Sequence, residues 1–387
     1  MAGGKVSGAG ERGAGLSGTE ASGTEVSGTI VSVLPPREGF SPGSVGAIGL
    51  LVHRLGRQDD VVVGQATGAL TFSGRRFVPA ETPVWPLLGR VDRYMAGAVR
   101  SVQRLAPRLI EVHNRARLAV RLARACPQAR VVLFVHNDPQ AMRGARLPAE
   151  RRALLGLMTV VCVSHWLAER FSDGLAAGAP APEILENTLD FTEVPPLLPP
   201  ERRDRTILFV GRVVANKGTD AFVASCADAL PLLPGWSACI IGADRFAPGG
   251  KPTAFERALH PSARAAGVAM LGYLPHAEVM QAMARAAILV VPSRWTEPFG
   301  MTALEGAACG AALVCSMRGG LRRVVGEAAL VADPDAPGAL AAAIVRLAGD
   351  AALRAQLSAA GLERARLFDA RDARVRLAQL RARLLRT

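Results

Sequence analysis

The chain has 387 residues, half of them apolar and 5% aromatic, with a formal net charge of +13. This length allows two ordinary domains with separate cores, and no apolar run approaches the roughly eighteen residues that a membrane span needs. The six cysteines stand singly in apolar runs, which predicts buried thiols of a reduced compartment and no metal site. The charge favours acidic partners, yet only Lys5, Lys217 and Lys251 are lysines among the 46 cations, so an arginine-rich, generally basic surface accounts for it equally well.

Residues 1–29 have the composition of a low-complexity tail, with "SGTE" at 17–20 and again at 22–25. Such a segment has too little apolar surface to offset its chain entropy, so we expect it to be disordered. It lacks the apolar core of a secretory signal, which favours a cytoplasmic protein.

Short β-branched runs alternate with helical stretches over residues 30–190, for example "TIVSVL", "VVVG", "LIEVH", "RVVLFVH" and "TVVCVS". Residues 191–205 contain four prolines and a charge run, as a linker would, and the alternation restarts over 206–369. Alternation of this kind predicts an α/β fold of two Rossmann-like, doubly wound domains. Ligands of such folds bind at the carboxyl ends of the strands, here in a central cleft that both domains face.

Two cations follow the first strand of the second half. The strand "ILFVG" runs directly into "RVVANKG", so Arg212 and Lys217 emerge at its carboxyl end on a glycine-flanked loop. A planar guanidinium and a compact ammonium could clamp a diphosphate there. Two solvated loop charges remain the alternative.

Two glutamates bracket the start of a predicted helix in "PSRWTEPFGMTALEGAACG", residues 292–310. The helix is expected to begin at about residue 298 and to end at Gly310, with Glu297 at its positive end and Glu305 about two turns further in. They lie on one element, unlike the paired acids that flank a bond in a glycosidase. They suit an extended polyhydroxyl ligand whose anionic middle rests on the helix N-terminus beside Gly300. A capping acid plus a solvated acid is the alternative.

The combination of "GRVVANKG" with "VPSRWTEPFGMTALEGAACGAALVCSMRGGLRRVV" resembles the donor-binding half of retaining glycosyltransferases of the GT-B fold, notably family 4 with its glutamate-x7-glutamate motif. The resemblance implies the GT-B fold, a helix over residues 370–387 that crosses back to the first domain, and a nucleoside diphosphate sugar as donor. The implied contacts are the diphosphate with Arg212 and Lys217, the transferred sugar with Glu297, sugar and phosphate with the N–H groups of Phe299, Gly300 and Met301, the ribose with Glu305, the nucleobase with Gly272 and Tyr273, and the phosphate with Gly43.

Two departures from the family pattern stand out. Where relatives often read glycine-glycine-x-x-glutamate after the second motif, this chain has "GGLRRVV", so Arg322 or Arg323 replaces the acid. The usual paired glycines of the N-terminal loop are spread out as "PGSVG". Neither departure removes the residues expected to bind the donor. Both concern the details of acceptor binding and of the N-terminal loop.

Two His-Asn pairs end strands in the first half, in "EVHNRARL" and "FVHNDPQAMRG". We interpret His113 as structural. We expect His136 to be catalytic, because similar transferases place a histidine there near the transferred sugar. Asn137 and Asp138 are nearby candidates for orientation or acceptor contact. The "HNDP" stretch resembles a subgroup that builds bacterial lipopolysaccharide or exopolysaccharide.

The expected activity is that of a retaining hexosyltransferase, which moves a sugar from a nucleoside diphosphate sugar to a glycan or lipid-linked acceptor. We expect no cofactor, no metal and no nucleic-acid partner. A sugar-nucleotide epimerase of the same fold and a non-catalytic nucleotide-binding protein are the alternatives. Arginines alternating with apolar residues over 114–126 would allow peripheral contact with the anionic inner face of a membrane.

Overall fold

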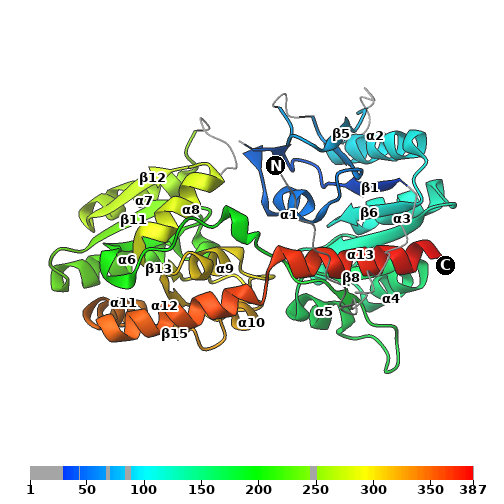
Figure 1. Ribbon diagram of the computed structural model, residues 1–387. Helices are drawn as coiled ribbons and strands as arrows, with labels where there is room; N and C mark the ends of the chain where they lie inside the picture. Colours follow the sequence, from blue (N-terminus) through cyan, green and yellow to red (C-terminus); the bar gives the residue numbers. More distant parts are fainter. Residues whose placement is uncertain (1–28, 43, 67–69, 83–88, 245–250, 387) are drawn as a thin grey trace, which may run out of the picture.

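The computed structural model describes residues 29–42, 44–66, 70–82, 89–244 and 251–386. The predicted tail therefore lies outside the described residues except for Thr29, and so does the predicted phosphate contact Gly43. The described strands form two large parallel sheets and one small antiparallel hairpin. Figure 1 shows the two sheets in separate halves of the molecule, each covered by helices.

The first sheet lies entirely within residues 30–184. Its strands, in spatial order, are β5 (Arg76–Pro79), β4 (Val61–Gly64), β1 (Ile30–Val33), β6 (Leu109–His113), β7 (Arg130–Val135), β8 (Thr159–Cys162) and β9 (Glu183–Ile184). The accompanying helices are α1 (Ala47–Leu55), α2 (Arg90–Leu105), α3 (Ala116–Ala125), α4 (Pro148–Leu157) and α5 (His165–Ser172), and the hairpin is β2 (Phe40–Ser41) with β3 (Ser44–Val45). The central strands are buried on both faces, which explains why they read as continuous apolar runs in the sequence.

The second sheet is built from residues 204–331. Its spatial order is β12 (Val268–Gly272), β11 (Ser237–Ile241), β10 (Asp204–Val210), β13 (Ala286–Val291), β14 (Ala312–Cys315) and β15 (Ala329–Val331). Its helices are α6 (Thr219–Ala229), α7 (Ala254–Ala265), α8 (His276–Arg285), α9 (Met301–Ala308), α10 (Leu321–Val325), α11 (Ala339–Gly349) and α12 (Ala351–Arg366). The strand order reverses between β10 and β13, and such a switch point opens a crevice at the carboxyl ends of the strands.

The last helix, α13 (Ala370–Arg386), returns to the first domain. Its buried residues Ala370, Ala373, Leu377, Leu380 and Leu385 belong to the core of that domain, and Figure 1 shows α13 lying along it. Arg381 of α13 donates to the buried carboxylates of Glu111 on β6 and Asp60. The crossing therefore combines apolar packing with a buried ion cluster.

The amphipathic stretch around α3 faces inward. Leu118 and Leu122 are fully buried in the core of the first domain, whereas Arg117 and Arg124 are exposed. The apolar residues that were expected to face lipid thus pack against the protein. The exposed residues of this helix are Arg117 and Arg124.

Candidate active site

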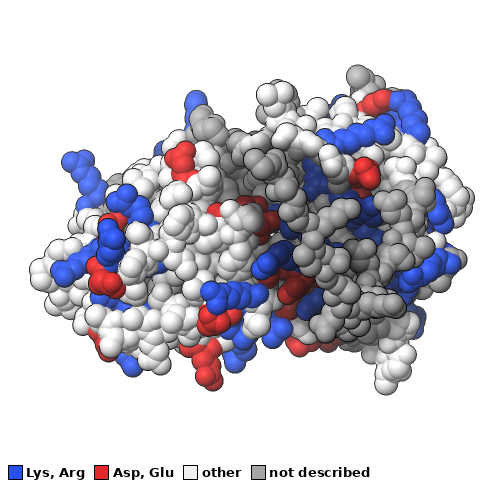
Figure 2. Space-filling view, in the orientation of Figure 1, with Lys and Arg blue, Asp and Glu red and all other residues white. Residues whose placement is uncertain are grey.

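A cleft of about 560 Å³ lies between the two domains. It is lined by loops that follow strands of both sheets, as well as by the start of α1 and of α9. Figure 2 shows the surface indented between the two halves, with acidic and basic side chains at the indentation. The predicted residues that line the cleft are His136, Arg212, Lys217, Tyr273, Glu297, Phe299, Gly300 and Met301.

Lys217 and Glu297 form an ion pair in this cleft. Lys217 Nζ donates to Glu297 Oε1 at 2.6 Å, and the side chains are 23% and 10% exposed. The ammonium also lies 4.8 Å from the ring centroid of Trp295, which lines the cleft as well. The cation expected at the diphosphate and the acid expected at the sugar are therefore direct neighbours.

Strand order explains this meeting. Because β10 and β13 are adjacent parallel strands, the loops at their carboxyl ends lie side by side. The carbonyl of Asn216 accepts from the N–H groups of Arg294 and Trp295, at 2.9 and 2.8 Å. Gly218 has a φ of 72°, and a Cβ there would lie 1.9 Å from the Pro292 carbonyl oxygen, so only glycine permits this close approach.

Helix α9 begins later than the sequence suggested. Its first residue is Met301, and Gly300 precedes it with a left-handed φ of 115°. Glu297 is instead bridged to Gly319, and its carbonyl accepts from the N–H of Gly320 at 2.7 Å. The left-handed turn at Gly300 separates this extended segment from the helix, which corrects the expected start at residue 298. The predicted end is confirmed, because Gly310 adopts a left-handed φ of 75° just after the helix.

Arg212 also has an acidic neighbour. Its guanidinium donates to Asp244 at the carboxyl end of β11, through Nε at 3.1 Å and through Nη2. Arg212 lines the cleft with a side chain that is 45% exposed. Each of the two predicted diphosphate cations therefore has a carboxylate partner, which an anionic ligand would share or displace.

Glu305 does not line the cleft, although Met301 and Thr302 of the same helix do. Its Oε1 is 2.9 Å from Nε2 of His276, the first residue of α8. Burial lowers the pKa of His276, but the hydrogen bond to Glu305 and the charge of that carboxylate outweigh burial, so the net shift is upward. Gly272 likewise does not line the cleft, and its carbonyl accepts from Gly242 N–H at 2.7 Å.

His136 enters the cleft from the first domain, together with Asn137. Its Nε2 lies 3.0 Å from Nδ1 of His113, so the histidine interpreted as structural is its immediate partner. Asp138 does not line the cleft. It caps a short turn by accepting from Gln140 N–H and pairs with Arg170, which gives it a structural contact.

Two further residues of the first domain were missed. Glu38 lines the cleft and accepts from Gly49 N–H in the first turn of α1 at 2.8 Å; burial raises its pKa, opposed by backbone hydrogen bonds from Gly49, Gly46 and Ile48. Ser164, 1% exposed, donates its hydroxyl to the carbonyl of Pro298 across the domain boundary at 2.6 Å. Neither follows from sequence spacing: the Glu38 contact depends on how the loop before α1 folds back on that helix, and the Ser164 contact joins segments 134 positions apart.

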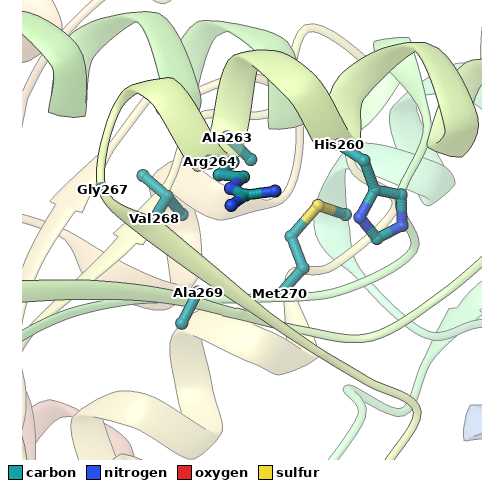
Figure 3. A pocket seen from close by; sticks show the side chains of 7 residues that line it. All are labelled: His260, Ala263, Arg264, Gly267, Val268, Ala269 and Met270. Carbon is teal, nitrogen blue, oxygen red and sulfur yellow. The ribbon is translucent and has the colours of Figure 1, made fainter.

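A second depression, of about 370 Å³, lies at the sheet edge between α7 and β12. Figure 3 shows its lining of His260, Arg264 and Met270 with smaller residues. None of the predicted site residues belongs to it.

Within the described ranges, no group of three or more His, Cys, Asp or Glu side chains is placed to hold a metal ion. No helix in the described part of the chain has the length and apolar character to cross a membrane.

Two facing parallel α/β domains with a C-terminal helix returning to the first define the GT-B fold. The chain resembles sucrose-phosphate synthase from Thermosynechococcus elongatus with a TM-score of 0.75 and 20% identity, over 92% of this chain and 99% of that one. It also resembles HepE from Anabaena, solved in complex with UDP-glucose, with a TM-score of 0.71 and 17% identity, over 92% and 100% of the two chains. The predicted fold class is thereby confirmed.

Residues 191–364, a little less than half of the chain, match the family model of Glycosyl transferases group 1. The O-antigen chain mannosyltransferase B of Escherichia coli is 40% identical over 98 residues, which cover 25% of this chain and 26% of that protein. The D-inositol 3-phosphate glycosyltransferase of Acidothermus cellulolyticus is 34% identical over 157 residues, or 39% and 35% of the two chains. The matched segments thus span about a quarter to a third of these curated relatives.

Proposed function

We propose that this protein is a retaining hexosyltransferase that moves a sugar from a nucleoside diphosphate sugar to a glycan or lipid-linked acceptor. The observation that carries the proposal is the cleft itself, because it brings His136 of one domain to the same space as Lys217, Glu297 and Gly300 of the other. The family match over residues 191–364 supports glycosyl transfer. A nucleotide-sugar donor agrees with the complex in which the Anabaena relative was solved.

In the proposed reaction the diphosphate leaves with the electron pair of the bond to the anomeric carbon. Lys217, Arg212 and the backbone N–H groups at the start of α9 stabilise the developing negative charge. The acceptor oxygen bonds to the anomeric carbon on the same face, and its proton passes to the leaving diphosphate. Glu297, already held by Lys217, orients sugar hydroxyls and does not attack the sugar.

At the nucleoside end we propose that Glu305 binds the ribose, and that Gly272 and Tyr273 lie near the base. Glu305 is held by His276 next to the cleft, so ribose binding would require the carboxylate to share or exchange that partner. Tyr273 lines the cleft directly.

We propose a role in the synthesis of cell-surface polysaccharide, lipopolysaccharide or exopolysaccharide. The similarity to an O-antigen mannosyltransferase supports it. Peripheral contact with the inner face of the membrane is part of this proposal and now rests on charge alone, since Leu118 and Leu122 are buried. Co-sedimentation with anionic vesicles should fall when Arg117 and Arg124 become glutamine. Equal binding to neutral vesicles would contradict it.

An epimerase of the same fold is the second candidate, because it would use the same donor pocket. It would convert a nucleotide sugar with no acceptor present, whereas the transferase requires one. A third candidate, a non-catalytic nucleotide-binding protein, would bind without turnover. A donor-only assay, run beside one with an acceptor extract, separates the three.

The first experiment is a thermal-shift screen of nucleoside diphosphate sugars. A ligand at a hundred times its Kd should add about 2.7 kcal/mol to the free energy of unfolding. We expect stabilisation by one base and sugar series and by the corresponding nucleoside diphosphate. No stabilisation by any nucleoside diphosphate or nucleotide sugar would contradict the proposed donor.

A further inference from the structure

The two His-Asn pairs of the sequence meet in one cluster. Strands β6 and β7 are parallel neighbours, with His113 in register with Phe134, so the residues that follow them are brought together. The rings of His113 and His136 have centroids 5.3 Å apart, and a hydrogen bond of 3.0 Å joins His113 Nδ1 to His136 Nε2. Oδ1 of Asn114 accepts from the N–H groups of His136 and Asn137, each at 3.2 Å.

The two histidines have different surroundings. His136 lines the cleft, whereas His113 is stacked on Phe134 at 4.8 Å behind it. Burial lowers the pKa of His136 well below its usual value and that of His113 to about 3, with the charge of Arg381 adding to the effect on His113. Both rings are therefore neutral at physiological pH, and in the bond between them one nitrogen donates and the other accepts.

That bond occupies Nε2 of His136. The remaining ring nitrogen, Nδ1, is then the one available to a ligand in the cleft. Because each neutral imidazole carries one N–H, the direction of the bond with His113 determines whether Nδ1 donates or accepts.

On its far side, His113 borders a small polar cavity. His113 Nε2 is buried and has no hydrogen-bond partner among the described residues. The adjoining cavity has a volume of about 20 Å³ and is lined by Ser32, Glu111 and Arg381 as well as by apolar side chains. A cavity needs roughly 10 to 15 Å³ and two or more polar partners to hold a water molecule, so this one fits a single water.

We propose that His113 is a positioning residue, which fixes the ring orientation and the tautomer of His136 while a buried water bonds its own Nε2. This deepens the proposed function, since it rests on His136 contacting the transferred sugar. The position of the proton in the bond between the two rings determines whether His136 offers the donor an N–H group or a lone pair at Nδ1.

A double-mutant cycle tests the proposal. His113→Phe keeps an aromatic ring against Phe134 and removes the bond to His136, whereas His113→Asn keeps a polar group close to the position of Nδ1. The matched control is His53→Phe, since His53 of the same domain also stacks on a phenylalanine, Phe72, at 3.9 Å. Each variant is assayed for kcat, for KM and for the Kd of the nucleoside diphosphate.

We expect His113→Phe to lower kcat about tenfold or more with the Kd of the nucleoside diphosphate unchanged, because misplacement of a catalytic group affects turnover. His113→Asn should lose less, His53→Phe should match the wild type, and adding His113→Phe to His136→Ala should cause no further loss. Independent, multiplicative losses would overturn the proposal. If His136→Ala itself retains full turnover, the proposed role of His136 fails. If only the His113 variants retain it, this inference alone fails.

A spectroscopic measurement covers the case in which His113→Phe does not fold. Long-range ¹⁵N–¹H correlation spectra of the wild-type protein should show His136 in one neutral tautomer between about pH 6 and pH 8. A mixture of tautomers, or a protonated ring in that range, would also overturn the proposal.

Discussion

Lys217 Nζ lies 2.6 Å from Glu297 Oε1, so two residues that are 80 positions apart form one ion pair in the cleft. In the proposed mechanism the ammonium serves the diphosphate and the carboxylate serves the sugar. The pair orients both groups before the donor arrives, which reduces the reorganisation that binding requires.

Replacing Lys217 should separate phosphate binding from nucleoside binding. Lys217→Ala is expected to weaken the nucleoside diphosphate about ten- to a hundredfold, since a bond to a charged group contributes about 1.5 to 3 kcal/mol. Binding of the nucleoside should be almost unchanged. Calorimetry measures both, with Lys251→Ala as the control for loss of an exposed lysine. Equal weakening of both ligands would make Lys217 a structural residue.

The two glutamates should have opposite signatures. Glu297→Gln should depress turnover, because the sugar loses the carboxylate that orients it. The nucleoside diphosphate should still bind, because it has no sugar and because Lys217, freed from its carboxylate partner, can still contact the phosphates. Glu305→Ala should weaken the diphosphate and the intact donor by similar factors, roughly ten- to a hundredfold, since both carry the ribose. Calorimetry and steady-state rates distinguish them. If Glu297→Gln abolishes binding of the nucleoside diphosphate and Glu305→Ala leaves it intact, the assignment of Glu297 to the sugar and Glu305 to the ribose is wrong.

Most strands and helices follow from the pattern of apolar residues along the sequence. Which side chains pair with one another in the cleft does not follow from it. The runs "VVVG" and "RVVLFVH" become β4 and β7, and the stretch from Ala116 to Ala125 becomes α3, because buried parallel strands and amphipathic helices leave strong patterns. The pairs Lys217–Glu297 and His113–His136 depend on which strands are neighbours. A single sequence does not specify strand order. The late start of α9 likewise depends on the left-handed turn at Gly300.

The ion cluster that attaches α13 to the first domain should be strongly stabilising in context. Arg381 is 6% exposed and bonds both Glu111 and Asp60 at 2.7 to 2.8 Å. Arg381→Met should lower the free energy of unfolding by about 3 to 5 kcal/mol, because two buried carboxylates lose their cation. Exposed Arg376→Met should change it by less than about 0.5 kcal/mol. Denaturant unfolding measures both, and the loss should shrink at acid pH, where Asp60, whose pKa is raised by burial, protonates.

The His276–Glu305 pair predicts a pH-dependent contribution to stability. The pKa of His276 in the folded protein is raised above its usual value of 6.5. The stabilising contribution is therefore complete below pH 6.5 and is lost as the pH rises through the folded pKa. His276→Gln should therefore destabilise the protein more at about pH 5.5 than at about pH 9. The exposed His260→Gln is the control for replacing a surface histidine. A loss for His276→Gln that grows with pH would contradict the sign.

The fate of the anomeric centre tests the proposed retaining transfer most directly. Nucleotide sugars selected by the thermal screen are incubated with the protein and a lipid and glycan extract, and the anomeric proton is followed by NMR. We expect acceptor-dependent transfer in which the first product keeps the anomeric configuration of the donor, with reduced transfer in Glu297→Gln. An inverted product, conversion of the donor without an acceptor, or no turnover by the wild-type protein would contradict it.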